Sequence, residues 1–235
     1  MINSRLPFRT ARKTSRDGFT LVELLVVIGI IAILAGVALG PITSGIEKAK
    51  ESSAMQSARS INLLCFSYSN DNNQTYPVGA ASIDVAKALL NGGYATDPTI
   101  FFLQGASKYA GTGAPYADFQ PNNISWDFTA GPITPPATTA TGLTSAASDS
   151  LPVVYCTGEN VAYPTTASQG LNLTLSGKGP FKNNGIAVAY KSNSAVFMKG
   201  TFTSATQATV NGFISTSDSD TTAYTQVKSG NPLYQ

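Results

Sequence analysis

Glu23 has the most unusual surroundings of any residue that could do chemistry in this chain. It is the only charged residue in the stretch from Phe19 to Ile42, where 18 of 24 residues are apolar. An acid inside such a stretch either lies near its edge, where water solvates it, or has a partner within the apolar surroundings. The sequence therefore leaves two interpretations of Glu23, a solvated acid and a paired, functional one.

Residue types that carry most enzymatic chemistry are scarce here. The chain has no histidine, which excludes a Ser-His-Asp or Cys-His catalytic site and removes the commonest metal ligand. Two cysteines cannot form a structural zinc site by themselves. The glycines around Lys178 lack the spacing of a phosphate-binding loop. The composition therefore indicates a protein that is not an enzyme.

Two pairs of residues remain as candidates, one for a disulfide bond and one for a metal site. Cys65 and Cys156 either form a disulfide, which an oxidising compartment would allow, or are two buried thiols. Asp218 and Asp220 could supply oxygen ligands to Ca²⁺, but their spacing is incomplete and a solvated acidic loop explains them as well. No other cofactor is expected.

The apolar stretch that contains Glu23 is long enough to cross a membrane. A helix over residues 19–42 reaches roughly 36 Å, against a bilayer core of about 30 Å. Its Leu, Ile, Val and Phe residues favour insertion by roughly −7 kcal/mol, which outweighs the cost of about +3 kcal/mol for one acid. We therefore predict a transmembrane helix over residues 19–42.

Residues 1–18 form a basic leader, with five Lys or Arg against Asp17 as the single acid. Positive flanks stay cytoplasmic, so the bulk of the chain is expected across the membrane. An ordinary secretory signal has an apolar region of only about 7–15 residues, followed by its cleavage site. Cleavage before the apolar run fits better, with an uncleaved anchor as the alternative.

Residues 19–235 hold ten basic and twelve acidic residues, so charge gives no reason to expect nucleic-acid binding.

Residues 16–23, Arg-Asp-Gly-Phe-Thr-Leu-Val-Glu, resemble the prepilin cleavage and N-methylation signature of type IV pilins and type II secretion pseudopilins. The resemblance rests on Gly18, Phe19, Glu23 and the apolar run behind them. It implies cleavage after Gly18 by a prepilin peptidase and methylation of the new Phe19 amino group. It also implies that Glu23 pairs with the Phe19 amino group of a neighbouring subunit in a filament.

The same resemblance implies a set of partners. These are other copies of the chain in a homopolymer, the prepilin peptidase and N-methyltransferase, an assembly platform, minor pilins and the inner membrane. None of them is indicated by composition or periodicity alone.

Periodicity extends the helix beyond the membrane. From Ile46 to Tyr68, apolar and small residues recur every three or four positions, which is typical of an amphipathic helix. The Asn, Asp and Gln residues at 70–74 favour a turn. We predict one helix over residues 18–70, whose part from 43 to 70 packs on a domain, with a kink or melted turn at Pro41.

Residues 71–235 are predicted to form an extracytoplasmic globular domain. It begins with a short helix over Ser82 to Gly92 and contains a Thr/Ser/Pro-rich loop over 129–150. Alternating or β-branched patterns predict strands at 153–156, 171–175, 186–190 and 195–198, and one more edge strand from 202 and 210–214. The segments 186–190 and 195–198 are the clearest hairpin, turning at Ser192-Asn193. The expected class is α+β and pilin-like, with one long N-terminal helix packed on an antiparallel sheet.

The resemblance implies a structural function, that of a prepilin-like subunit of a type IV pilus. Two alternatives stay open, a pseudopilus protomer of a type II secretion system and a membrane-anchored binding protein that never polymerises. The precursor is expected to be a single-pass inner-membrane protein whose bulk is periplasmic. After assembly it is expected in an extracellular pilus or a periplasmic pseudopilus.

Overall fold

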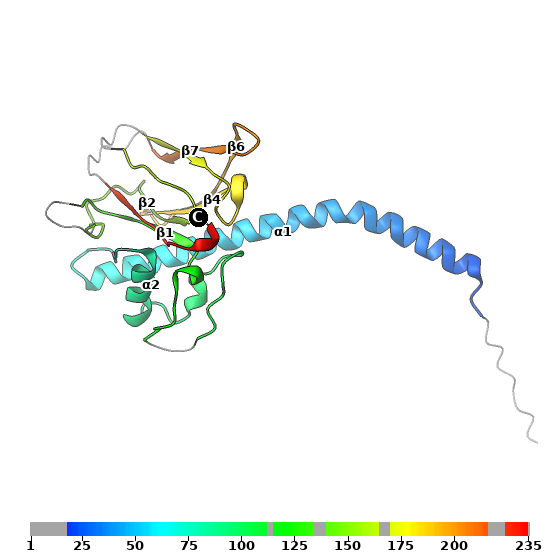
Figure 1. Cartoon of the computed structure of the whole chain (residues 1–235), viewed down its shortest axis with the longest axis horizontal. Coiled ribbons are helices and arrows are strands. Elements are labelled where there is room, and N and C mark those ends of the chain that lie inside the picture. The colour runs from blue at the N-terminus through cyan, green and yellow to red at the C-terminus, as the bar shows by residue number, and fades with distance from the viewer. Residues whose placement is uncertain (1–17, 112–114, 134–139, 165–169, 216–223, 235) are drawn as a thin grey trace, which may run out of the picture. The chain divides into compact units, whose positions relative to one another are not determined.

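The computed structural model of this 235-residue chain describes residues 18–111, 115–133, 140–164, 170–215 and 224–234. They form one long helix, one short helix, eight strands and four 3₁₀ turns (Figure 1). The chain divides into two compact units, residues 1–47 and residues 48–235. The long helix α1 (Leu21–Asp71) begins in the first unit and ends in the second, and all the buried residues within the described ranges belong to the second.

The backbone of α1 confirms the predicted long helix but not the melted turn at Pro41. Helical structure continues through Pro41 although proline cannot donate a backbone hydrogen bond. Side chains one turn later bond to nearby carbonyls: Thr43 Oγ1 donates to Gly40 O (2.9 Å) and Ser44 Oγ donates to Pro41 O (3.0 Å). Both bonds lie beside the proline, but neither replaces the backbone bond that Pro41 cannot donate.

The second half of α1 packs on the sheet through one narrow stripe. Its apolar members are at most 1% exposed and recur at steps of three and four residues: Ala54, Ala58, Ile61 and Cys65. Buried Asn62 lies beside the stripe and donates from Nδ2 to the carbonyl of Tyr190 (2.9 Å). The amide of Asn62 therefore ties α1 to a turn more than a hundred residues away.

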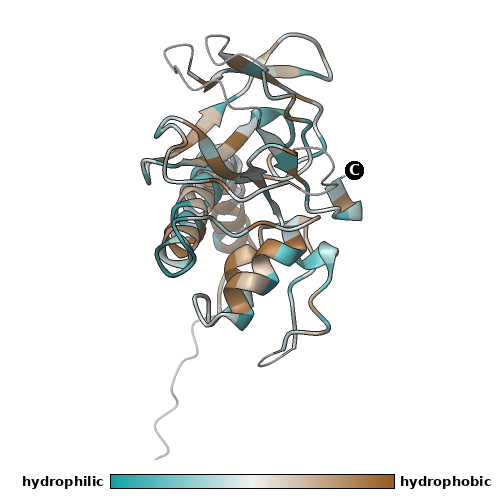
Figure 2. Cartoon of the chain, turned by 90° about the vertical axis from the view of Figure 1, so that its left-hand side faces the viewer, coloured by the Kyte–Doolittle hydropathy of each residue, from teal (hydrophilic) through white to brown (hydrophobic). Residues whose placement is uncertain are grey.

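The polar cluster after α1 forms the predicted turn. Asn73 and Gln74 both adopt left-handed backbone conformations, with φ of 52° and 57°. The Gln74 amide donates to Ser69 O (2.8 Å), which closes the end of the helix. Figure 2 shows the hydrophilic character of the chain at this end of α1.

Helix α2 (Ser82–Asn91) confirms the short helix, but Ser82 is not its cap. Ala81 occupies the cap position, and its amide donates to Asp84 Oδ2 (2.9 Å). Ser82 is instead fully buried, and its Oγ donates to Val227 O (2.8 Å). The hydroxyl group of Ser82 therefore does not cap the helix but joins α2 to a C-terminal strand.

The larger sheet is antiparallel and has five strands in the order β5-β4-β2-β1-β8. Their bounds are β1 Trp126–Ala130, β2 Pro152–Cys156, β4 Gly185–Tyr190, β5 Ala195–Lys199 and β8 Thr225–Val227. Strand β8 at one edge and its neighbour β1 were not predicted as strands. Aromatic side chains on and near β1 lie in the core, with Trp126 and Phe119 at 0% exposure and Phe128 at 2%.

The hairpin of β4 and β5 confirms the predicted pair. Ile186 lies opposite Met198 and Ala189 opposite Ala195. Asn193 has a φ of 60°, which asparagine tolerates better than most residues. Its amide donates to Tyr190 O (2.8 Å), so the turn lies where the sequence placed it.

The remaining strands form a second antiparallel sheet, β3-β7-β6, rather than an extra edge of the first. Its strands are β3 Leu171–Leu175, β6 Thr201–Phe202 and β7 Ala208–Ile214. It covers the face of the five-stranded sheet opposite α1 and α2 (Figures 1 and 2). Phe213 of β7 meets Tyr155 of β2 edge to face at 5.3 Å. This contact joins the two sheets.

The loop predicted over 129–150 is partly ordered by the sheet. Thr129 and Ala130 belong to β1, and Thr75 forms a β-bridge with Thr144. The 3₁₀ turns are η1 Pro98–Phe101, η2 Pro121–Asn123, η3 Lys182–Asn184 and η4 Pro232–Tyr234.

Candidate processing and assembly site

The beginning of α1 is closed by a reciprocal pair of side-chain bonds. Residues 18–20 precede the helix, and the carbonyl of Thr20 accepts its first bond from the Leu24 amide (3.2 Å). Thr20 Oγ1 accepts from the amide of Glu23 (3.2 Å), and Glu23 Oε2 accepts from the amide of Thr20 (2.8 Å). This arrangement is a capping box, which satisfies two backbone donors that a helix end otherwise leaves unpaired.

The capping box fixes the carboxylate of Glu23 at the end of the helix. Glu23 Oε2 accepts a second bond from Thr20 Oγ1 (2.8 Å). The carboxylate therefore lies where the unpaired backbone N–H groups create a positive potential. Both bonds end on Oε2, which leaves Oε1 for a donor on another molecule. Sequence reasoning missed Thr20, although the Thr-x-x-Glu spacing is the signal of a capping box.

The bond between Gly18 and Phe19 lies outside the helix. Phe19 is 85% exposed, so an enzyme can approach the peptide from solvent. A Cβ placed on Gly18 would meet no described atom within 4 Å. The fold itself therefore does not require glycine at this position, and a requirement for it would come from a processing enzyme.

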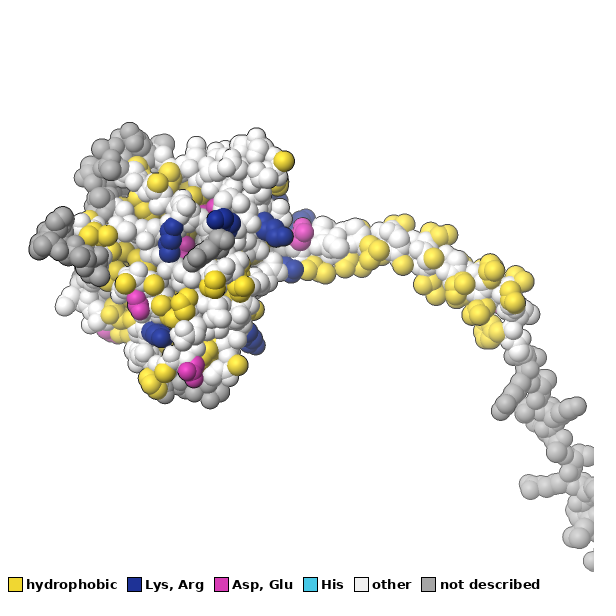
Figure 3. Space-filling model, in the orientation of Figure 1, with side chains coloured by type: hydrophobic (Ala, Val, Ile, Leu, Met, Phe, Trp, Pro, Cys, Tyr) yellow, Lys and Arg dark blue, Asp and Glu magenta, His cyan; other side chains and the backbone are white. Residues whose placement is uncertain are grey.

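The first half of α1 presents a continuous apolar surface. Every Leu, Ile and Val from Leu21 to Ile42 is at least 48% exposed, and Figure 3 shows hydrophobic side chains along this part of the helix. A soluble monomer rarely exposes so large an apolar area. By length and composition, α1 is the one helix in the described ranges that could cross a bilayer.

The two cysteines lie in the core of the second unit. Cys65 on α1 and Cys156 on β2 are both buried, and each has a free thiol in the structure. Burial raises the pKa of the Cys65 thiol above its usual range and raises that of Cys156 to about 12. Disulfide formation between them stays a prediction, which free-thiol counting on denatured, unreduced protein would test.

The candidate calcium ligands Asp218 and Asp220 lie outside the described residues, as does the leader up to Asp17. Within the described ranges, no group of three or more Cys, Asp or Glu residues is arranged to hold a metal ion.

Comparison with known families identifies the beginning of the chain. Residues 13–39 match the prokaryotic N-terminal methylation motif, which is typical of type IV pilins and type II pseudopilins. The chain carries a prepilin-type methylation motif. The match covers Gly18, Phe19, Thr20 and Glu23 together with most of the exposed apolar surface. No curated protein and no solved structure matches the chain.

The prepilin motif implies a precursor that a prepilin peptidase processes and that is anchored in a membrane by its N-terminal helix. The α+β arrangement agrees with it, since a long N-terminal helix packs on antiparallel sheets. The prepilin-type motif also suggests a structural rather than an enzymatic protein.

Proposed function

We propose that this chain is a prepilin-like structural subunit that is cleaved after Gly18 and polymerises through its apolar N-terminal helix into a type IV pilus. The observation that carries the proposal is the match of residues 13–39 to the methylation motif. The exposed, non-helical bond after Gly18 supports it, because a peptidase can reach that bond without unwinding α1. The exposed apolar side chains from Leu21 to Ile42 would lie in lipid before assembly and in the filament core afterwards.

Glu23 is proposed to set the position of neighbouring subunits. Cleavage creates a cationic amino group on Phe19, and neither this cation nor a lone carboxylate is stable in an apolar core without a partner. The capping box gives Glu23 a partner in its own chain through Oε2. Oε1 then pairs with the Phe19 amino group of the next subunit, which fixes the axial register.

A pair of variants separates processing from assembly. Gly18→Val is expected to block cleavage because a peptidase that needs a close approach to the backbone cannot accept the branched side chain. Glu23→Gln is expected to be cleaved and inserted normally but to enter filaments poorly, because it removes one charge of the pair. Both are expressed in cells that lack the wild-type chain. N-terminal mass spectrometry of the membrane fraction and filament yield are the two measurements.

The outcomes of these variants are distinct. A mature N-terminus beyond Ala35 in the wild-type protein would indicate an ordinary secretory cut and would overturn the proposal. Normal filament yield from Glu23→Gln would overturn only the pairing between subunits. Glu23→Ala serves as a second variant, which also removes the capping bond to the Thr20 amide.

The proposed pilus subunit and its two alternatives differ in whether a polymer forms and where it forms. A pseudopilus protomer would give a secretion defect on deletion and no surface fibres, whereas a pilus subunit would appear in fibres sheared from the cell surface. A membrane-anchored binding protein would give neither result. Electron microscopy of sheared material, with antibody labelling of this chain, distinguishes the three.

A further inference from the structure

A polar pocket lies at one end of the five-stranded sheet, far from the processing site in the sequence. Its volume is about 350 Å³. Three of the segments that line it meet here: β1 contributes Asp127, the loop after β2 contributes Asn160, and the residue directly after β8 is Lys228. Because β1 lies between β2 and β8, this end of the sheet brings together residues that are widely separated in sequence.

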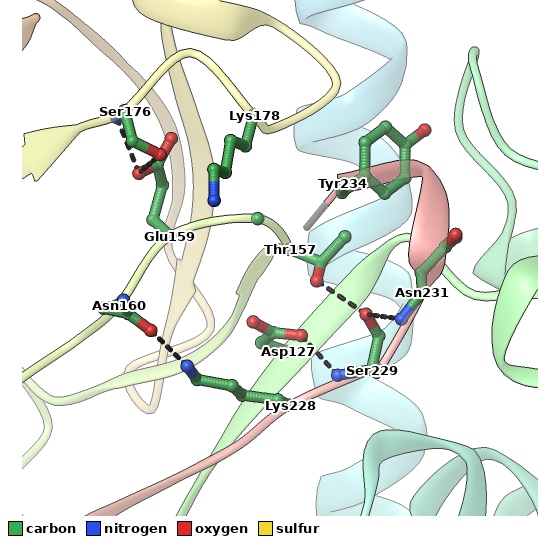
Figure 4. A pocket seen from close by; sticks show the side chains of 12 residues that line it. Asp127, Thr157, Glu159, Asn160, Ser176, Lys178, Lys228, Ser229, Asn231 and Tyr234 are labelled. Carbon is green, nitrogen blue, oxygen red and sulfur yellow. Dashed lines mark hydrogen bonds between the residues drawn. The ribbon is translucent and has the colours of Figure 1, made fainter.

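Within this pocket, an amine and a carboxamide are in direct contact. Lys228 Nζ donates to Asn160 Oδ1, across a separation of 68 residues. Figure 4 shows the Lys228 side chain pointing toward Asn160, with Asp127 beside the pair. The nucleophilic nitrogen of Lys228 is therefore directed at the carboxamide group of Asn160.

Asp127 is held rigidly beside this pair. It is 1% exposed, and its Oδ1 accepts from the Ser229 amide (2.7 Å) while its Oδ2 accepts from Gln226 Nε2 (2.9 Å). Burial raises the pKa of Asp127 to about 6, against the lowering effect of the bonds from Thr157, Ser229 and Gln226 and of the Lys228 charge. A carboxyl group with such a pKa can both accept and donate a proton near neutral pH.

We propose that Lys228 and Asn160 become joined by an intramolecular isopeptide bond, with Asp127 as the proton carrier. The reaction needs no oxidant, metal or enzyme, because the amine, the carboxamide and the acid–base group all belong to this chain. The modification would fasten the segment after β8 to the loop after β2.

The bonds and protons of this reaction balance. In the first step, the Asp127 carboxylate takes one proton from the Lys228 ammonium group. The free amine attacks Cγ of Asn160 and forms the new C–N bond, and the bond from Cγ to Nδ2 then breaks. Of the two protons that Nζ loses, Asp127 passes one to the departing Nδ2, and the other leaves with ammonia as ammonium. The product is a secondary amide, and the chain becomes lighter by one ammonia molecule.

A second lysine in the pocket provides an internal comparison. Lys178 also lines it, and its charge lowers the pKa of Glu159, whose carboxylate accepts bonds from the Ser176 amide (2.8 Å) and hydroxyl (2.9 Å). Burial is the larger influence and raises the pKa of Glu159 overall. Because the group whose pKa Lys178 influences is a carboxylate rather than a carboxamide, Lys178 is expected to remain a free amine.

The test is mass spectrometry of the full-length protein, purified from membranes in detergent, denatured and digested with trypsin. The expected result is a branched peptide that contains Asn160 and Lys228, lighter by one ammonia than its two components, with no cleavage after Lys228. Lys228→Arg keeps the positive charge and the bond to Asn160 but removes the nucleophile, so the branched peptide should disappear. Asn160→Ala should have the same effect, and Lys178→Arg should leave the branched peptide unchanged.

The role of Asp127 is tested separately with Asp127→Asn, which keeps the size of the side chain. We expect the two component peptides to appear unlinked in this variant, while its single tryptophan still reports a folded core. Recovery of unlinked peptides from the wild-type protein, with cleavage after Lys228, would overturn the proposal. A branched peptide that persists in Asp127→Asn would overturn the proton-carrier role alone.

Discussion

At the scale of single residues, two acidic side chains show how surroundings decide behaviour. Glu23 is exposed and its carboxylate is held by Thr20 at a helix end, where an anion is favoured. Asp127 is buried in the sheet, where loss of water penalises its charged form. The first therefore supports local structure as an anion, whereas the second is more stable when protonated.

The stability of the second unit is expected to rise on mild acidification. The folded pKa of Asp127 is about 6, above its ordinary value of 3.8, so the folded state binds this proton more tightly than the unfolded state does. The stability gained is present below about pH 4 and is lost as the pH rises to about 6. The difference is at most about 3 kcal/mol. Glu159, whose pKa is also raised, changes stability in the same direction.

Thermal unfolding between pH 7 and pH 4.5 measures this effect. The wild-type protein should show a rising midpoint as the pH falls, and Asp127→Asn should show a smaller rise because it cannot titrate. Equal pH dependence in the two proteins would mean that Asp127 is not the group responsible.

At the scale of elements, two nearby residues of α1 lie on different faces of the helix and differ in burial. Ile61 is fully buried against the domain, whereas Leu63 is 51% exposed. Ile61→Ala is expected to lower the free energy of unfolding by about 2–5 kcal/mol, because it leaves a cavity. Leu63→Ala, on the exposed side, should change it by less than about 1 kcal/mol.

Urea unfolding followed by tryptophan fluorescence checks this pair of variants. The chain has one tryptophan, Trp126, which is fully buried in β1 and reports on the core. Similar losses for both variants would mean that α1 packs through a different face.

Elements with a local signal could be predicted from the sequence, and elements without one could not. The β4–β5 hairpin was predicted because its alternating residues flank a turn containing Asn193, which suits a left-handed backbone. Strand β1 was missed although its residues alternate between apolar and polar types, because the Thr/Ser/Pro-rich composition after it placed Thr129 and Ala130 in a loop; both polar residues, Asp127 and Thr129, are buried. The partners that make those polar side chains acceptable in the core lie far away in sequence, as Ser229 does for Asp127.

The same distinction applies to the candidate sites. Gly18, Phe19 and Glu23 are consecutive or nearly so, and their spacing alone indicated the motif that residues 13–39 match. The contact between Asn160 and Lys228 depends on the order of strands in a sheet, which no local pattern reveals.

At the scale of the whole molecule, the division between Glu47 and Lys48 separates an apolar helical segment from a domain with its own core. Among the described residues the first buried one is Ala54, and the candidate span has no buried residue. A chain that starts at Lys48 is therefore expected to fold and to stay soluble without detergent. Circular dichroism and tryptophan fluorescence should give the same unfolding midpoint as the intact protein in detergent. Aggregation of the shortened chain would show that residues before Lys48 contribute to the core.

The buried cysteines make this protein convenient for attaching a fluorophore. A thiol reacts as its thiolate, and burial together with a raised pKa protects both Cys65 and Cys156 from maleimide reagents. The turn between β6 and β7 is exposed over residues 203–207, so Ala205→Cys would offer a single accessible thiol. A dye attached there would test the proposed pilus, because its fibres would then be visible on living cells.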